Sequence, residues 1–331
     1  MKKIILFIML IMLVLASSCK IMKREPRIVK QPETEEEAVS VENEAESLYK
    51  EGNYTYAVQN IKALLKKDPD NPKYWNQMGS AYAQMNEFNY AVYSFEQALE
   101  RNPKDTKSMY NLSVVLGEQG DTEKSLKVLK KALELEPKNP LLQASLGNIL
   151  IDRESYDTAG KIYENIVRAK PDFDIGHYNL GVINYMQKDL DAAQKNYTRV
   201  LQLNPGDNDA RQNLSAIYIM KENFKEAVEQ LEYIVKSNVK DDTVLSNAYF
   251  NLGIARLRLG QHKKALNDFE MTISIEPWDM AAYVNAAILC EELGLEKKAI
   301  EYWQKYDRLL PTNKRKKEIK ERLEKLEGSK N

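Results

Sequence analysis

The stretch WNQMGSAYAQMNEFNYAVYSFEQALERNP, residues 75–103, decides the fold that we expect for most of the chain. Large apolar residues recur in it at helical spacing in two runs, and a small residue stands in each run, Gly79 and then Ala91. The stretch ends at Pro103, which lacks a backbone donor and restricts the residue before it. The pattern therefore predicts two packed helices, the second of which ends just before the proline.

The same pattern recurs along the chain with a fixed period. Five prolines follow one another at a constant interval of about 34 residues, and two more near the end are separated by the same interval. They are Pro69, Pro103, Pro137, Pro171, Pro205, Pro277 and Pro311. Aligned on this period, the sequence gives eight units: 38–71, 72–105, 106–139, 140–173, 174–207, 208–245, 246–279 and 280–311.

Two positions within the unit hold a small residue in every copy. The eighth residues are Ala45, Gly79, Ser113, Gly147, Gly181, Ser215, Gly253 and Ala287. The twentieth residues are Ala57, Ala91, Ser125, Ala159, Ala193, Ala227, Ala265 and Ala299. Glycine inside a helix costs about 1 kcal/mol relative to alanine, so its recurrence needs a compensating contact. Because closely packed helices leave room for only small side chains where they cross, we expect the eighth position to meet the twentieth.

This pattern resembles the tetratricopeptide repeat, a helix–turn–helix unit of about 34 residues. The best match to the family pattern is the unit 72–105, through Trp75, Met78, Gly79, Tyr82, Ala91, Phe95, Ala98 and Pro103. The resemblance implies an all-α fold, a right-handed α-solenoid of about eight repeats. It also implies that the first helix of each repeat lines a concave groove.

The ends of the repeat array and one internal unit depart from the pattern. The first unit has Glu44 where the family usually has Leu, so we expect a frayed cap there. The sixth unit is longer than the others and has Val239 in place of the proline, which predicts a longer loop or helix and a local break in superhelical pitch. Residues 312–331 place Ile319, Leu323 and Leu326 at helical spacing and predict a C-terminal capping helix and tail. The basic excess of this segment also suits a partner or headgroup patch.

The pattern of the N-terminal residues indicates a targeting segment. Two lysines precede thirteen apolar residues, 4–16, and small residues then lead to Cys19. The apolar run is shorter than the roughly 18 to 20 residues that a transmembrane helix needs. The boundary resembles a bacterial lipobox, which implies a lipoprotein signal peptide at 1–18 and lipidation of Cys19. The alternative is an ordinary signal peptide with an incidental cysteine.

Residues 19–37 predict a charged tether between the lipid and the repeats. Basic residues dominate 20–30, which favours contact with anionic headgroups, and the acidic run QPETEEE at 31–37 reads as a solvated linker. We therefore expect a membrane-anchored lipoprotein of the bacterial cell envelope, facing the periplasm or the surface. Lys20 follows Cys19 where an inner-membrane retention signal has aspartate, so the outer membrane is favoured.

The composition and motifs give no sign of catalysis. The sequence contains two histidines and two cysteines, and no metal-binding or phosphate-binding motif. His177 and His262 stand where the family places large or aromatic residues, so we interpret both as packing substitutions, and Cys290 as a small buried residue. The acidic residues fall at solvent-facing phases. We expect no enzyme, no cofactor and no metal, and the near-neutral net charge of −1 argues against nucleic acid.

The candidate binding residues lie at positions that packing does not require. The sixth position is asparagine in six of eight units: Asn43, Asn111, Asn179, Asn213, Asn251 and Asn285. An amide offers one acceptor and two donors, which suits it to bind the backbone of an extended peptide. The row resembles the asparagine ladder of O-linked N-acetylglucosamine transferases. The alternative is that asparagine is merely usual at this position.

Aromatic residues accompany the row. Tyr110, Tyr178 and Phe250 hold the fifth position and Tyr185 the twelfth, which suits a protein segment of modest charge. The lysine and asparagine pattern with which related repeats clamp an acidic C-terminal tail is absent from the sequence, so we exclude that subclass.

We therefore expect a lipid-anchored protein-interaction scaffold that binds another envelope protein or a peptide segment in the groove. The alternative is a structural assembly factor, similar to pilotin or outer-membrane-assembly lipoproteins, that acts through its convex face or its ends. A third class, an envelope enzyme, would need a catalytic constellation that the sequence lacks. The sequence leaves homo-oligomerisation open.

Overall fold

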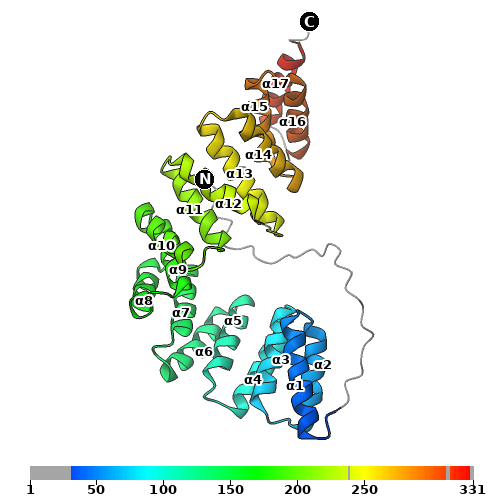
Figure 1. The fold of residues 1–331 in the computed structure, drawn as a ribbon, viewed down its shortest axis with the longest axis vertical. Helices are drawn as coiled ribbons and strands as arrows, with labels where there is room; N and C mark the ends of the chain where they lie inside the picture. Colours follow the sequence, from blue (N-terminus) through cyan, green and yellow to red (C-terminus); the bar gives the residue numbers. More distant parts are fainter. Residues whose placement is uncertain (1–30, 238, 311–313, 329–331) are drawn as a thin grey trace. The chain divides into compact units, whose positions relative to one another are not determined.

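The computed structural model describes residues 31–237, 239–310 and 314–328. These residues form seventeen α-helices and no strand (Figure 1), which confirms the expected all-α repeat solenoid. The expected signal peptide, Cys19 and the basic part of the tether lie outside the described residues. The helices are α1 (Glu35–Lys50), α2 (Tyr54–Lys67), α3 (Pro72–Gln84), α4 (Phe88–Arg101), α5 (Thr106–Glu118), α6 (Thr122–Leu135), α7 (Pro140–Asp152), α8 (Tyr156–Ala169), α9 (Asp174–Met186), α10 (Leu190–Leu203), α11 (Asn208–Met220), α12 (Phe224–Lys236), α13 (Asp242–Arg258), α14 (His262–Ile275), α15 (Met280–Glu292), α16 (Glu296–Leu309) and α17 (Lys314–Gly328).

The chain divides into two compact units, Met1–Asp121 and Thr122–Asn331. In the first unit α1 packs on α2 and α3 on α4. In the second unit the pairs are α7 with α8, α9 with α10, α11 with α12, α13 with α14 and α15 with α16. Each pair is one repeat, and the helices of the remaining repeat, α5 and α6, belong to the first and the second unit respectively. The first helices of successive repeats also touch directly, α7 with α9 and α11 with α13.

The turn inside every repeat uses the same backbone conformation. Its fifteenth residue has a positive φ in all eight repeats, although only four of these residues are glycine. They are Gly52, Asn86, Gly120, Glu154, Lys188, Glu222, Gly260 and Gly294. The second helices end two residues before the repeating prolines, as predicted, for example α8 at Ala169 before Pro171.

The first repeat is better formed than the sequence suggested. Thr34 caps α1 through a capping box with Glu37, so the helix begins at Glu35 and takes in the end of the expected linker 31–37. The interpretation of this repeat as a frayed cap is wrong, because α1 runs for 16 residues and buries Ala45 in the core.

The long sixth unit is accommodated by a longer helix. The helix α13 has 17 residues where α11 and α15 have 13, and it begins at Asp242, four residues before the expected boundary at 246. Asp241 caps it through the backbone N–H groups of Thr243 and Val244. The break in pitch stays a prediction.

The small eighth position lies against a side chain that the sequence analysis did not identify. A Cβ at Gly79, Gly147, Gly181 or Gly253 would lie 2.5–2.8 Å from the ring of an aromatic residue at position 24. These rings belong to Phe95, Tyr163, Tyr197 and Phe269. In these four repeats the ring at position 24 is therefore the nearest side chain to position 8. The contact with position 20 stays a prediction, and all seven alanines at that position are fully buried.

The C-terminal helix α17 packs on the last repeat. Ile319 is buried, and Leu323 and Leu326 pack beside it in the cluster that holds Tyr283 and Trp303. The apolar stripe predicted from the sequence thus covers the end of the repeats. Cys290 is fully buried in the neighbouring cluster, as predicted.

One acidic residue contradicts the expectation that all carboxylates face solvent. Asp268 on α14 is only 1% exposed. It accepts two hydrogen bonds from Arg256 of α13, at 2.7 and 2.9 Å, while Glu232 of α12 accepts a third from the same guanidinium at 2.6 Å. Burial raises the pKa of Asp268 to about 6 in spite of Arg256.

Candidate functional site

The predicted binding asparagines lie on the first helices of the repeats. Four of them form what we call the amide row of the second unit: Asn179 on α9, Asn213 on α11, Asn251 on α13 and Asn285 on α15. All four side chains are half-buried and none belongs to an apolar core cluster. Asn111, also half-buried, lies on α5 in the first unit together with Tyr110.

Two of these amides bind their own helix. The Nδ2 group of Asn179 donates to the carbonyl of Ile175 at 3.0 Å, and that of Asn285 donates to the carbonyl of Ala281 at 2.8 Å. Both contacts reach back by four residues, which holds the side chain against the helix surface. The amide oxygen and one N–H of each side chain remain for another partner.

Two other amides reach back to the preceding repeat. Asn213 donates to the hydroxyl of Tyr178 at 3.1 Å, and Asn111 donates to the amide oxygen of Asn76 at 3.4 Å. Asn251 makes no side-chain hydrogen bond within the part of the chain that the structure describes. Each amide of the row therefore keeps unused hydrogen-bonding capacity.

The aromatic residues predicted beside the row are partly committed to packing. Tyr178 packs edge-to-face on Tyr197 and Phe250 on Phe269, both with ring centroids 5.6 Å apart. Burial raises the pKa of Tyr178 to about 12 and raises that of Tyr185. Tyr178 and Asn213 are thus joined directly, whereas Tyr110 belongs to the other compact unit.

A recurring hydrogen bond at the fourth position of the repeat was not predicted from the sequence. In four repeats this residue donates a hydrogen bond to the carbonyl of the proline that ends the preceding repeat. The pairs are Trp75 with Pro69, Gln143 with Pro137, His177 with Pro171 and Arg211 with Pro205. The four side chains share only an N–H donor, so no single residue type signals the contact.

The two histidines have different surroundings. His177 is half-buried, binds Pro171 O through Nε2 at 3.1 Å and faces Asn196 Oδ1 through Nδ1 at 3.2 Å. The side chain of His262, which we interpreted as a packing substitution, is 40% exposed and lies 3.3 Å from Glu292.

Two other features are not found in the part of the chain that the structure describes. Within the described residues, no group of three or more His, Cys, Asp or Glu side chains is arranged to hold a metal ion. None of the helices described by the structure combines the length and apolar character required to cross a membrane.

Comparisons with known proteins agree with this architecture. The tetratricopeptide repeat family matches residues 116–180 and 185–248. The family of YpiA-like, C-terminal tetratricopeptide repeats matches residues 72–139. None of the curated proteins compared gives a significant match to the sequence.

Solved structures share the fold at low sequence identity. A tetratricopeptide repeat protein from Parabacteroides merdae is 17% identical, with a TM-score of 0.55 over 76% of this chain and 98% of that one. The pilF protein of Pseudomonas aeruginosa is 15% identical, with a TM-score of 0.57 over 69% of this chain and 99% of that one. A chain of the APC/C hetero-tetramer Cut9–Hcn1 is 12% identical, with a TM-score of 0.57 over 88% of this chain and 56% of that one.

Proposed function

Because this chain belongs to the tetratricopeptide-repeat family, whose repeats serve as protein-interaction scaffolds, we propose that it binds an extended protein segment along the amide row. The segment would cross α9, α11, α13 and α15 and contact Asn179, Asn213, Asn251 and Asn285 in turn. We also place the protein in the bacterial cell envelope, held at the membrane by lipid on Cys19, and its partner in the same compartment.

The proposal rests on the burial and the hydrogen bonding of the four amide side chains. They recur once per repeat, they are half-buried, and none is buried in an apolar cluster. Asn179 and Asn285 use one N–H internally, which fixes the direction of the remaining donor and acceptor. A row of oriented amides offers alternating donors and acceptors to the backbone of an extended chain.

The surroundings of the row favour a ligand of modest charge. Its neighbours are the aromatic residues Tyr178 and Phe250, and the amides themselves are neutral. Because an amide row contacts backbone groups, recognition would depend little on the side chains of the ligand. No part of this scheme requires catalysis, so we propose that the protein is not an enzyme.

The lipid anchor rests on the sequence alone. The apolar run 4–16, the small residues before Cys19 and the basic residues that follow support it. Mass spectrometry of the membrane-extracted protein tests it, since diacylated Cys19 as the N-terminal residue is the expected product. Retention of the segment 1–18, or an unmodified thiol at Cys19, would contradict the anchor.

The groove proposal is tested by affinity capture from detergent-solubilised envelope. The bait is the full chain, compared with a triple variant Asn179→Ala, Asn213→Ala, Asn251→Ala that has the same circular dichroism spectrum. We expect a partner that the parent retains and the variant loses. A partner retained equally by both would contradict the groove and favour the assembly factor that works through its convex face or ends.

A further inference from the structure

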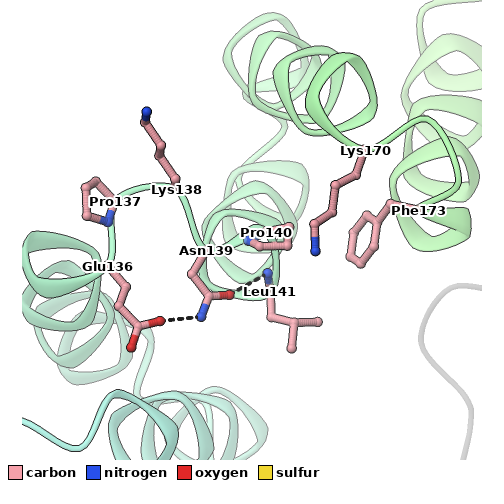
Figure 2. A pocket seen from close by; sticks show the side chains of 8 residues that line it. All are labelled: Glu136, Pro137, Lys138, Asn139, Pro140, Leu141, Lys170 and Phe173. Atoms are coloured by element: carbon pink, nitrogen blue, oxygen red, sulfur yellow. Dashed lines mark hydrogen bonds between the residues drawn. The ribbon is translucent and has the colours of Figure 1, made fainter.

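An open pocket of about 670 Å³ lies between two turns that connect successive repeats. One turn joins α6 to α7 and the other joins α8 to α9. Figure 2 shows the lining residues: Glu136, Pro137, Lys138, Asn139, Pro140, Leu141, Lys170 and Phe173. None of them belongs to the amide row, and all lie in the second compact unit.

The pocket contains a residue that breaks the pattern of the other turns. The residue before each first helix α3, α5, α7, α11, α13 and α15 is Asn or Asp, and its side chain accepts a backbone N–H of that helix. Before α9 this residue is Phe173, which makes no capping hydrogen bond. Asp174 compensates in part, because its carboxylate accepts the N–H of Ile175 at 2.8 Å.

The backbone around Phe173 leaves room for its ring. A Cβ at Gly176 would lie 3.2 Å from Phe173 Cδ1 and 2.7 Å from Val167 Cγ1. One side of the ring thus packs against the core cluster of this repeat, while the ring still lines the pocket. Across the pocket Leu141 is 45% exposed, which is high for a large apolar side chain. The floor of the pocket is therefore apolar and open.

The charged residues of the lining are two lysines and one glutamate. Figure 2 shows Lys170 reaching toward Pro140 and Leu141, and Lys138 at the rim pointing outward. Within the described part of the chain, neither ammonium group pairs with a carboxylate. The one carboxylate of the lining, Glu136, accepts a hydrogen bond from Asn139 Nδ2 at 2.7 Å.

We propose that this pocket is a second docking site, which binds a partner-protein segment that carries an apolar side chain flanked by carboxylates. The apolar side chain fills the space between Leu141 and Phe173, and the carboxylates pair with Lys138 and Lys170. This role explains why an aromatic ring replaces a helix cap at this turn alone among those described. The site does not depend on the amide row, so the failure of either proposal leaves the other standing.

The test is a fluorescence-anisotropy titration with the full chain purified in detergent. The probe is a fluorescein-labelled peptide GEDLFDEG, compared with GKRLFRKG, which reverses its charge, and GEDAADEG, which lacks its apolar pair. We expect saturable binding of the first peptide only. The variant Lys138→Glu, Lys170→Glu should weaken it by at least about tenfold.

Two further variants separate docking from folding and from net charge. Phe173→Asn restores the residue type that caps the other helices, so it should keep the fold and lose the peptide. Lys104→Glu, Lys107→Glu makes the same change in charge at exposed lysines beside α5, outside the pocket, and should bind like the parent. No binding of GEDLFDEG, or equal loss in both lysine pairs, would overturn the proposal. So would a Lys138→Glu, Lys170→Glu variant that binds the peptide normally but no longer binds phosphatidylglycerol vesicles.

Discussion

A methyl group at Gly253 would lie 2.8 Å from Cε1 of Phe269, so the missing side chain of one helix makes space for the ring of the next. The same relation joins Gly79 to Phe95, Gly147 to Tyr163 and Gly181 to Tyr197. Where the eighth residue is serine, as at Ser113 and Ser215, the residue at position 24 is leucine. The sizes of the two residues are therefore matched in the six repeats that have glycine or serine at the eighth position, whereas the last repeat pairs Ala287 with Trp303.

This matching predicts the result of a paired substitution. Gly253→Ser alone should destabilise the protein by about 1–3 kcal/mol, because the Phe269 ring has no space to move. Gly253→Ser with Phe269→Leu recreates the Ser215–Leu231 pair, so the double variant should be more stable than the sum of the single effects predicts. Urea denaturation measures both. Strictly additive effects would show that the two positions are not coupled.

The turn inside the repeats predicts a stabilising glycine. Lys188 has a φ of 65°, a conformation that side chains disfavour, and it is exposed. Lys188→Gly should stabilise the protein by about 0.5–1 kcal/mol in urea denaturation. The matched control is Gly260→Ala, which meets no atom within 4 Å and should destabilise by a similar amount through conformation alone. A destabilising Lys188→Gly would contradict this interpretation of the turn.

The fourth-position hydrogen bond predicts that two substitutions of Arg211 destabilise the protein to different extents. This guanidinium donates to Pro205 O at 2.6 Å and to Gln230 Oε1 at 2.7 Å, and it lies 3.7 Å from the Tyr233 ring centroid. Arg211→Leu removes all three contacts and should cost about 2 kcal/mol by thermal or urea denaturation. Arg211→Gln copies the residue type of Gln143 in the fourth repeat, so it keeps a donor for Pro205 and should cost about half as much. Equal costs would exclude the hydrogen bond as the cause.

The buried carboxyl of Asp268 predicts a pH dependence of stability. Burial raises its pKa to about 6, so the folded chain holds this proton more tightly than the unfolded chain does. Protonated Asp268 therefore stabilises the fold fully below pH about 4, and this contribution is lost as the pH rises through 6. Relative to Asp268→Asn, the parent should therefore lose about 1–3 kcal/mol between pH 4 and pH 7.

The comparison uses urea denaturation at both pH values, with each protein measured in the same buffers. Asp268→Asn preserves the shape and an acceptor for Arg256, so the difference reports the charge. If the parent instead gained stability relative to the variant as the pH rises, the pairing with Arg256 would outweigh burial.

The repeat architecture could be predicted from sequence because each unit carries the same local signals. The spacing of the prolines and of the small residues predicted the helix pairs, and the structure confirms helices that end before Pro171 and its equivalents. The start of α1 was missed because an acidic run reads as a linker, whereas Thr34 and Glu37 form a capping box. That box was visible in the sequence as a threonine followed three residues later by glutamate.

Other features depend on residues that only the fold brings together. The partner of Gly253 could not be predicted from the sequence, because positions 20 and 24 of the second helix are both buried. Asp268 is buried beside Arg256, whose guanidinium also binds Glu232, and the three residues come from three different helices. One feature of the pocket is visible in the sequence, because Phe173 stands where the other repeats place Asn or Asp.

The central claim is that the amide row binds the backbone of an extended protein segment. Isothermal titration calorimetry tests it, with the shortest segment of a captured partner titrated into the parent chain and into Asn213→Ala, Asn251→Ala. We predict that the variant binds at least about tenfold more weakly. We also predict that alternate N-methylation of the segment abolishes binding to the parent, while alanine replacement of single side chains has little effect. Equal affinity of both proteins for the segment, or full binding of the N-methylated segment, would contradict the claim.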